Sequence, residues 1–136
     1  MLIVVDANVL CSALLARGRT LDLLFSDALE PIAPELLFVE VERHSGELLE
    51  KTKLSPQEFS TMLSALKRRI RTVPMQEFSS RLPAAGKMLG THSKDAQYVA
   101  LALAYGCPLW SKEKRLRSLP IRVMGASEVE SLISGA

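Results

Sequence analysis

The chain has 136 residues and a formal net charge of +2 at pH 7, with 48% hydrophobic and 24% charged residues. These values are typical of one folded globular domain and exclude a disordered chain. No apolar stretch is long enough to cross a membrane, and the first residues lack the features of a signal peptide, so we expect a cytoplasmic protein. Cys11 and Cys107 lie far apart and outside any zinc-binding spacing, which indicates reduced thiols and no structural zinc.

The first predicted strand is Leu2–Val5, a run of four large aliphatic residues of which three are β-branched. Such a run is typical of a strand that is buried on both faces. It ends abruptly on Asp6. An aspartate in this position either caps the following helix or is a placed functional group, and the local sequence leaves both readings open.

Helices are predicted before residue 71 over residues 9–16, 21–28, 34–51 and 56–70. Asn8 is expected to cap the first of them, and Pro34 is a favourable first residue for the third. The fourth begins with the capping box Ser55-Pro56-Gln57-Glu58, and its apolar residues recur at helical spacing. Between the second and third helices, Ile32–Ala33 is predicted to be a short strand.

The second half of the chain continues the alternation of short strands and helices. Strands are predicted at residues 71–73, 108–111 and 121–124, helices at 79–89, 95–105 and 128–133, and a basic turn or helix at 112–118. Asp95 opens the most hydrophobic of these helices, and Gly106 ends it. This alternation predicts an α/β sandwich with a mostly parallel sheet, in a single domain that covers residues 1–136.

Four acidic residues stand beside apolar segments. Asp6 ends a strand, Glu40 interrupts an apolar helix face, Asp95 lies in the first turn of an apolar helix, and Glu113 follows a strand. Each also has an ordinary interpretation as a cap, a helix-dipole partner or a surface residue. All four are expected at, or one turn from, the carboxyl edge of the parallel sheet, where ligands bind in such folds.

Carboxylates that converge in one cleft repel one another unless a cation offsets their charge. Ligation by oxygen atoms without Cys or His favours Mg²⁺ or Mn²⁺ over zinc. Such ions in acidic pockets typically serve phosphoryl chemistry. The four acids therefore suggest a metal site for a phosphate-containing substrate.

Two basic clusters lie in the sequence, and either of them is alternatively a solvated surface. Their members are Lys67, Arg68, Arg69 and Arg71 in the first cluster, and Lys112, Lys114, Arg115 and Arg117 in the second. Clusters of this kind suit contacts with the phosphates of a nucleic acid. They would hold a polyanion near an acidic site that otherwise repels it.

The order of these motifs resembles a PIN domain, and in particular the prokaryotic single-domain proteins related to VapC-type toxins. The resemblance covers essentially the whole chain. It rests on Asp6-Ala7-Asn8-Val9-Leu10, on Ala33-Pro34 followed by Glu40-Val41, on Lys94-Asp95 before the helix that contains Tyr98-Val99-Ala100-Leu101-Ala102-Leu103-Ala104, and on Pro108-Leu109-Trp110-Ser111.

The resemblance implies a three-layer α/β/α sandwich with a Mg²⁺- or Mn²⁺-dependent ribonuclease site. In the family, acids at the positions of Asp6, Glu40 and Asp95 bind the metal, and an asparagine at the position of Asn8 supports the first of them. Ser111 is expected to be a second supporting residue. The resemblance also implies an RNA substrate, a homodimer and a small antitoxin partner.

Two residues depart from the family's pattern. Glu113 stands where the family usually has a fourth aspartate, and its extra methylene group gives the carboxylate more freedom. His92 stands where close relatives often carry an acid, so one negative charge is lost there. These departures favour an alternative, in which the protein is a catalytically impaired PIN-like module with a nucleic-acid-binding or regulatory function.

The leading hypothesis is an endoribonuclease in which water attacks a backbone phosphodiester, expels the 3′ oxygen and leaves a 5′-phosphate. A phosphotransferase of the haloacid dehalogenase type also begins with an apolar strand that ends in aspartate. That chemistry needs a second aspartate two residues later, where this chain has Asn8.

Overall fold

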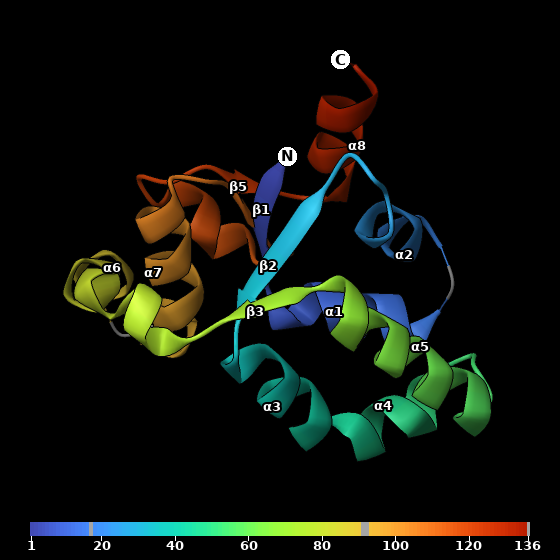
Figure 1. The fold of residues 1–136 in the computed structure, drawn as a ribbon. Coiled ribbons are helices and arrows are strands. Elements are labelled where there is room, and N and C mark those ends of the chain that lie inside the picture. The colour runs from blue at the N-terminus through green and yellow to red at the C-terminus, as the bar shows by residue number, and fades with distance from the viewer. Residues whose placement is uncertain (17, 91–92, 136) are drawn as a thin grey trace.

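The protein is built on one sheet of parallel strands, seen in the computed structural model of Figure 1, which describes residues 1–16, 18–90 and 93–135. The strands lie in the order β3-β2-β1-β4-β5. Their bounds are β1 Leu2–Val5, β2 Glu30–Pro34, β3 Arg71–Val73, β4 Leu109–Trp110 and β5 Val123–Met124. Each lies where the sequence predicts a strand, although β2 is longer than predicted and β4 and β5 are shorter.

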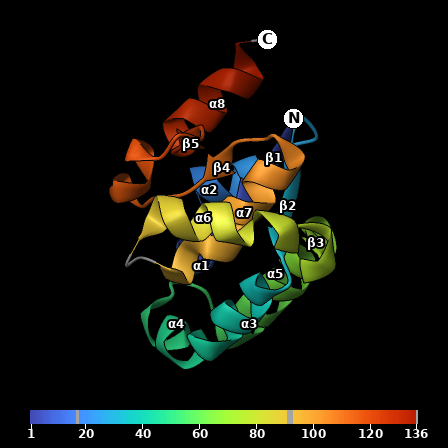
Figure 2. The same ribbon diagram turned by 90° about the vertical axis from the view of Figure 1, so that its left-hand side faces the viewer.

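Helices cover both faces of the sheet, which confirms the expected three-layer α/β/α sandwich. On one face, α7 (Ala96–Tyr105) packs against β1 and β2, and α6 (Leu82–Leu89) packs on its outer side (Figure 2). On the other side lie α1 (Ala7–Leu15) and α2 (Arg19–Leu24), with α5 (Pro56–Arg69) against α1. The final helix, α8 (Ala126–Ser134), packs against α2.

The carboxyl ends of β1 and β2 point toward α1 and α3 at the same edge of the sheet (Figure 1). The prediction of a single helix over residues 34–51 is wrong. The chain instead forms two helices, α3 (Leu36–Arg43) and α4 (Ser45–Lys51), with a break at His44. The hydroxyl of Ser45 donates to the Glu42 carbonyl oxygen at 2.8 Å, a local bond that competes with a continuous helix.

Two predicted helix starts are also wrong. Pro34 is the last residue of β2, since the φ angle that proline imposes suits an extended strand as well as a first helical turn. Asn8 lies inside α1, and Asp6 holds the N-cap position, where its side chain makes no capping hydrogen bond. The Asp6 carboxylate is therefore not used to begin the helix.

The other boundaries follow the sequence more closely. The capping box of α5 is present as predicted, with the Glu58 amide donating to Ser55 Oγ at 3.1 Å. α2 is shorter than the predicted 21–28, and α8 begins after Gly125 rather than after Ser127. Short 3₁₀-helices are formed at η1 Met75–Glu77, η2 Ser79–Arg81, η3 Ser93–Asp95 and η4 Lys114–Ser118; η2 lies at the start of the helix predicted over 79–89, η4 lies in the predicted basic turn, and η1 was not predicted.

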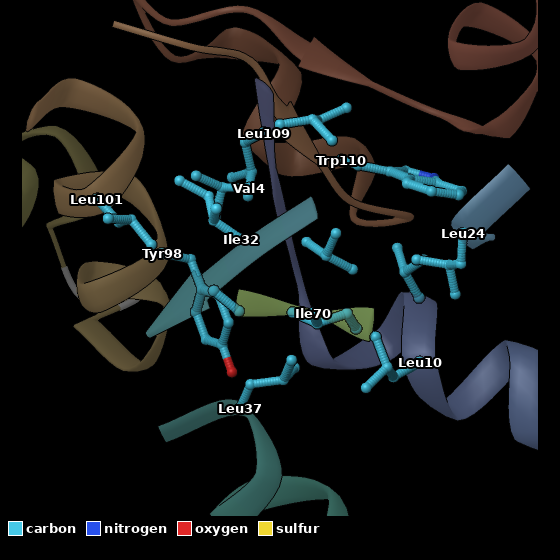
Figure 3. Close-up of a cluster of buried hydrophobic side chains, with 14 of the residues drawn as sticks. Val4, Leu10, Leu24, Ile32, Leu37, Ile70, Tyr98, Leu101, Leu109 and Trp110 are labelled. Carbon is cyan, nitrogen blue, oxygen red and sulfur yellow. The ribbon is translucent and has the colours of Figure 1, made fainter. Parts of the chain in front are cut away.

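The core fills both sides of the central strand. Ile3, Val4 and Val5 are completely buried, as the aliphatic run predicts. Figure 3 shows Tyr98 and Leu101 of α7 on one side of β1 and β2, and Trp110, Leu24 and Leu10 on the other. Burial of each large apolar side chain contributes about 1.5–3 kcal/mol, so the site at the end of β1 is attached to a rigid strand.

Arg69, at the end of α5, binds the chain that leads from α2 into β2. Its guanidinium donates to the carbonyl oxygens of Leu24, Ser26 and Leu29 at 2.8, 2.5 and 2.8 Å. The contact of Arg69 with nucleic acid stays a prediction, and in this structure its side chain is directed to carbonyl groups of the protein. Arg69 satisfies carbonyl groups at the end of a short helix and in the turn after it.

Replacement of Arg69 by alanine is expected to destabilise the fold by about 2–3 kcal/mol, because three carbonyl groups lose a charged donor. The free energy of unfolding in urea measures this change. Arg68→Ala is the matched control: Arg68 is the exposed neighbour on α5, and its loss should change stability by less than about 0.5 kcal/mol. Equal stability of the two variants would contradict a structural role for Arg69.

Candidate functional site

Three of the predicted acids come together beyond the carboxyl end of β1. Asp6 and Asp95 are only 5% and 7% exposed. Among the described residues, the other acidic side chains are not buried. The amide of Asp6 donates to the carbonyl oxygen of Trp110 at 3.0 Å, which joins the ends of β1 and β4. The negative charges of Asp95 and Glu40 both act on Asp6, so three distant parts of the chain meet there.

Burial raises the pKa of Asp6 to about 6 from its ordinary value of 3.8, because a desolvated carboxylate is costly to ionise. The hydroxyl of Ser111 donates to Asp6 Oδ2 at 2.6 Å and opposes this increase. The charges of Asp95 and Glu40 raise the pKa of Asp6 further. A cation bound beside Asp6 would relieve both the desolvation and the repulsion.

Glu40 is held by a tyrosine that the sequence analysis did not identify as a site residue. The hydroxyl of Tyr98 donates to Glu40 Oε1 at 2.5 Å. Figure 3 shows this hydroxyl directed toward α3, beside Leu37. Burial and the bond to Glu40 raise the pKa of Tyr98 above its ordinary value, so the phenol stays protonated and remains a donor. A tyrosine in an apolar helix one turn after Asp95 was the available signal, because a buried hydroxyl needs a partner.

Arg115 lies between the carboxylates of Asp95 and Glu113. Its Nη2 lies 2.7 Å from Asp95 Oδ2, and its Nε lies 3.4 Å from Glu113 Oε2. Its Nη1 is buried and has no hydrogen-bond partner among the described residues. Arg115 is therefore an internal counter-ion of the acidic site, whereas the sequence predicts a surface contact to nucleic acid.

Glu113 joins the site through Arg115, and its carboxylate side chain is 40% exposed. The amide of Glu113 donates to Ser111 Oγ at 3.1 Å, so one hydroxyl contacts both Glu113 and Asp6. Asn8, predicted to support Asp6, has another contact, since its side-chain oxygen accepts from the Lys112 amide at 3.3 Å. His92, the second departure from the family's pattern, lies outside the described residues.

The two basic clusters lie toward opposite edges of the sheet. Lys67, at the end of α5, pairs with Glu42. Arg71 is the first residue of the edge strand β3, and its guanidinium lies over the ring of Tyr105. In the second cluster, before the other edge strand β5, Arg117 pairs with Glu128 at 2.5 Å. The two clusters are therefore separated by the width of the sheet.

The acids have the donor chemistry for Mg²⁺ or Mn²⁺, since all of them offer carboxylate oxygens. As arranged, no group of three Asp, Glu, His or Cys side chains among residues 1–16, 18–90 and 93–135 is positioned to hold a metal ion. Arg115 supplies the positive charge beside Asp95 in this arrangement. The residues thus fit a divalent ion in type and charge, and the Arg115 guanidinium at Asp95 Oδ2 would repel an ion bound to the same carboxylate.

The model of the PIN domain family matches residues 4–132. The chain belongs to the PIN domain family. PIN domains are generally nucleases that act on nucleic acid, and they generally use divalent metals. None of the curated proteins compared with this PIN domain matches it. No helix in the described part of the chain has the length and apolar character needed to span a membrane.

Asp6→Asn tests the cost of burying this carboxylate. The pKa of Asp6 is higher in the folded protein than its ordinary value, so the stability that protonated Asp6 contributes is complete below about pH 4 and is lost as the pH rises through about 6. Without divalent metal, we expect Asp6→Asn to be more stable than the wild type by roughly 1–3 kcal/mol above about pH 7, and equally stable near pH 4.

Urea unfolding at a series of pH values in EDTA measures this difference. Asparagine keeps an oxygen that accepts the bond from Ser111, so the change removes charge and little else. Asp22→Asn, at an exposed position of α2, is the control and should show no gain that grows with pH. If the stability difference between Asp6→Asn and the wild type is the same at every pH, the burial of an ionised Asp6 is contradicted.

Proposed function

We propose that this PIN domain is a Mg²⁺- or Mn²⁺-dependent endoribonuclease whose metal ligands are Asp6, Glu40 and Asp95, with Glu113 at the fourth acidic position. The observation that carries this proposal is the buried Asp6 carboxylate, whose pKa is raised by burial and by the charges of Asp95 and Glu40. Perturbed titratable groups gathered in this way are typical of functional sites. The membership of a generally nucleolytic family supports the same conclusion.

The protein's own residues orient the carboxylates. Ser111 holds Asp6 by one hydrogen bond, and Tyr98 holds Glu40 by another. A carboxylate has about four acceptor positions, so Glu40 with Tyr98, and Asp6 with Ser111 and the Ala7 amide, both keep capacity for a cation. Donors that hold ligating groups in this way commonly fix their orientation. When bound, a divalent ion would supply water activation and would stabilise charge on the phosphate.

Substitution of either buried acid is expected to abolish the nuclease. Asp6→Asn and Asp95→Asn should each lower cleavage of single-stranded RNA at least about 100-fold, because each removes a charge that holds the ion. The assay measures fragments with 5′-phosphate ends, in Mg²⁺ and in Mn²⁺. Glu35→Gln is the control, since Glu35 is an exposed acid beside α3.

Circular dichroism verifies that each variant is folded. Cleavage that persists in both acid variants would overturn the assigned ligands. Cleavage of RNA in EDTA by the wild-type protein would overturn the metal dependence.

Arg115 and a divalent ion are expected to compete for Asp95. Arg115→Gln should therefore bind Mn²⁺ about fivefold more tightly than the wild type, a difference of about 1 kcal/mol, because no partly exposed ion pair has to be broken. Titration calorimetry with Mn²⁺ alone measures the Kd. Arg117→Gln removes a cation that pairs with Glu128 instead, and should leave the Kd unchanged. Equal or weaker Mn²⁺ binding by Arg115→Gln would show that Arg115 does not compete.

A second candidate function is a binding or regulatory module without efficient catalysis. It is favoured by the internal partners of the acids, since Arg115 holds Asp95 and Glu113, and Tyr98 holds Glu40. This module would bind RNA but would not cleave it in Mg²⁺ or Mn²⁺. The cleavage assay of the wild-type protein therefore distinguishes the two functions.

The finer biological role follows from the resemblance to proteins related to VapC-type toxins. We propose a cytoplasmic toxin that acts as a homodimer, as a single domain over residues 1–136, and that is inhibited by a small antitoxin. Lys112, Lys114 and Arg117 of the second cluster are the better candidates for contacts to RNA, because they line one pocket together with Ser111, which contacts Asp6.

A further inference from the structure

A pocket of about 580 Å³ opens between α2, η4 and the beginning of α8. Val9 and Trp110 form part of its apolar wall. Its polar lining is strongly biased in charge, with four cationic side chains and one acidic side chain: Arg19, Lys112, Lys114, Arg117 and Glu128. A concave site with an apolar wall and a few converging polar groups is typical of a ligand pocket.

The pocket shares a wall with the acidic site. Ser111 lines the pocket and donates its hydroxyl hydrogen to Asp6 Oδ2 at 2.6 Å. Lys112, the next residue, also lines the pocket, and its amide binds Asn8 in the first turn of α1. Ser111 and Lys112 thus connect the lining of the pocket to the end of β1 and the start of α1.

The cations of the pocket come from separate elements and are reachable. Arg19 begins α2, and its guanidinium donates to Ser127 Oγ at 3.2 Å. Arg117 is 47% exposed and reaches the start of α8. Lys114 makes no ion pair or hydrogen bond among the described residues, so its ammonium group is available to a ligand.

The beginning of α8 adds donors to the same wall. Gly125, Ala126 and Ser127 all line the pocket. The amide of Gly125 donates to Glu128 Oε1 at 3.1 Å, whereas the first amides of a helix have no acceptor within the helix itself. A Cβ atom at Gly125 would lie 3.0 Å from Arg117 Nη2, so glycine leaves room for the guanidinium at the pocket.

We propose that this pocket binds the phosphate and ribose of a nucleotide next to the cleaved bond on the RNA strand, an inference that rests on the proposed nuclease function. The volume falls within the range of about 300–1,000 Å³ that holds small ligands. The cations and helix amides suit a phosphate, and the apolar wall suits a sugar or base. An RNA strand fits better than an acidic peptide, because it offers both a phosphate for the cations and a sugar or base for the apolar wall.

Binding of a short fluorescent single-stranded RNA in EDTA tests the proposal without cleavage. Lys114→Gln and Arg117→Gln are each expected to weaken binding about 3- to 10-fold at low salt, and to reduce the slope of log K against log salt by about 0.7, the value for one lost phosphate contact on a single strand. Lys87→Gln on α6, at an exposed position outside the pocket, is the matched control and should bind like the wild type.

The outcomes separate this inference from the nuclease proposal. If the wild type cleaves RNA and the pocket variants bind RNA like Lys87→Gln, the pocket assignment is overturned while the nuclease stands. If the pocket variants weaken RNA binding but the wild type never cleaves, the nuclease fails and the pocket remains an RNA site. If a polyglutamate peptide binds in a Lys114-dependent manner and RNA does not, the pocket belongs to a protein partner, and the inference is overturned. Thermal melting confirms that each variant is folded.

Discussion

The burial of one carboxylate at the end of the central strand is the constraint on which the site depends. Asp6 follows three completely buried residues of β1, so its side chain begins in an environment that disfavours charge. The neighbouring groups stabilise the buried carboxylates in different ways. Ser111 stabilises the ionised form by a hydrogen bond, whereas Arg115 balances the charge of the nearby Asp95. The same constraint makes the place attractive to a divalent ion, because the hydrogen bonds from Ser111 and from the backbone of Ala7 offset only part of the cost of ionising Asp6.

Much of the fold is predictable from short segments. The aliphatic run of β1 and the capping box of α5 carry their structure in adjacent residues, and both form as predicted. The approach of Asp6, Glu40 and Asp95 is also predictable, because residues at the carboxyl ends of parallel strands and at the starts of the packed helices meet at one edge. The match of the PIN domain model over residues 4–132 includes all three of these positions.

The side-chain partners could not be predicted in the same way. The sequence places Arg69 and Arg115 in basic clusters. It does not reveal that Arg69 binds three carbonyl groups and that Arg115 binds two acids. These contacts join segments that are distant along the chain, and a local pattern of charge contains no information about them. Tyr98 was missed for the same reason, since its partner Glu40 lies 58 residues earlier. The helix start predicted at Pro34 was wrong because proline suits both the end of a strand and the start of a helix.

The contact between Ser111 and Asp6 spans 105 residues. Because β4 pairs directly with β1, the central strand lacks one of its two neighbours until Leu109 and Trp110 are present. A chain that is still being synthesised therefore holds Asp6 without Ser111 and Asp95 without Arg115. The acidic site is therefore assembled only after residues 109–115 have been synthesised and β4 has paired with β1.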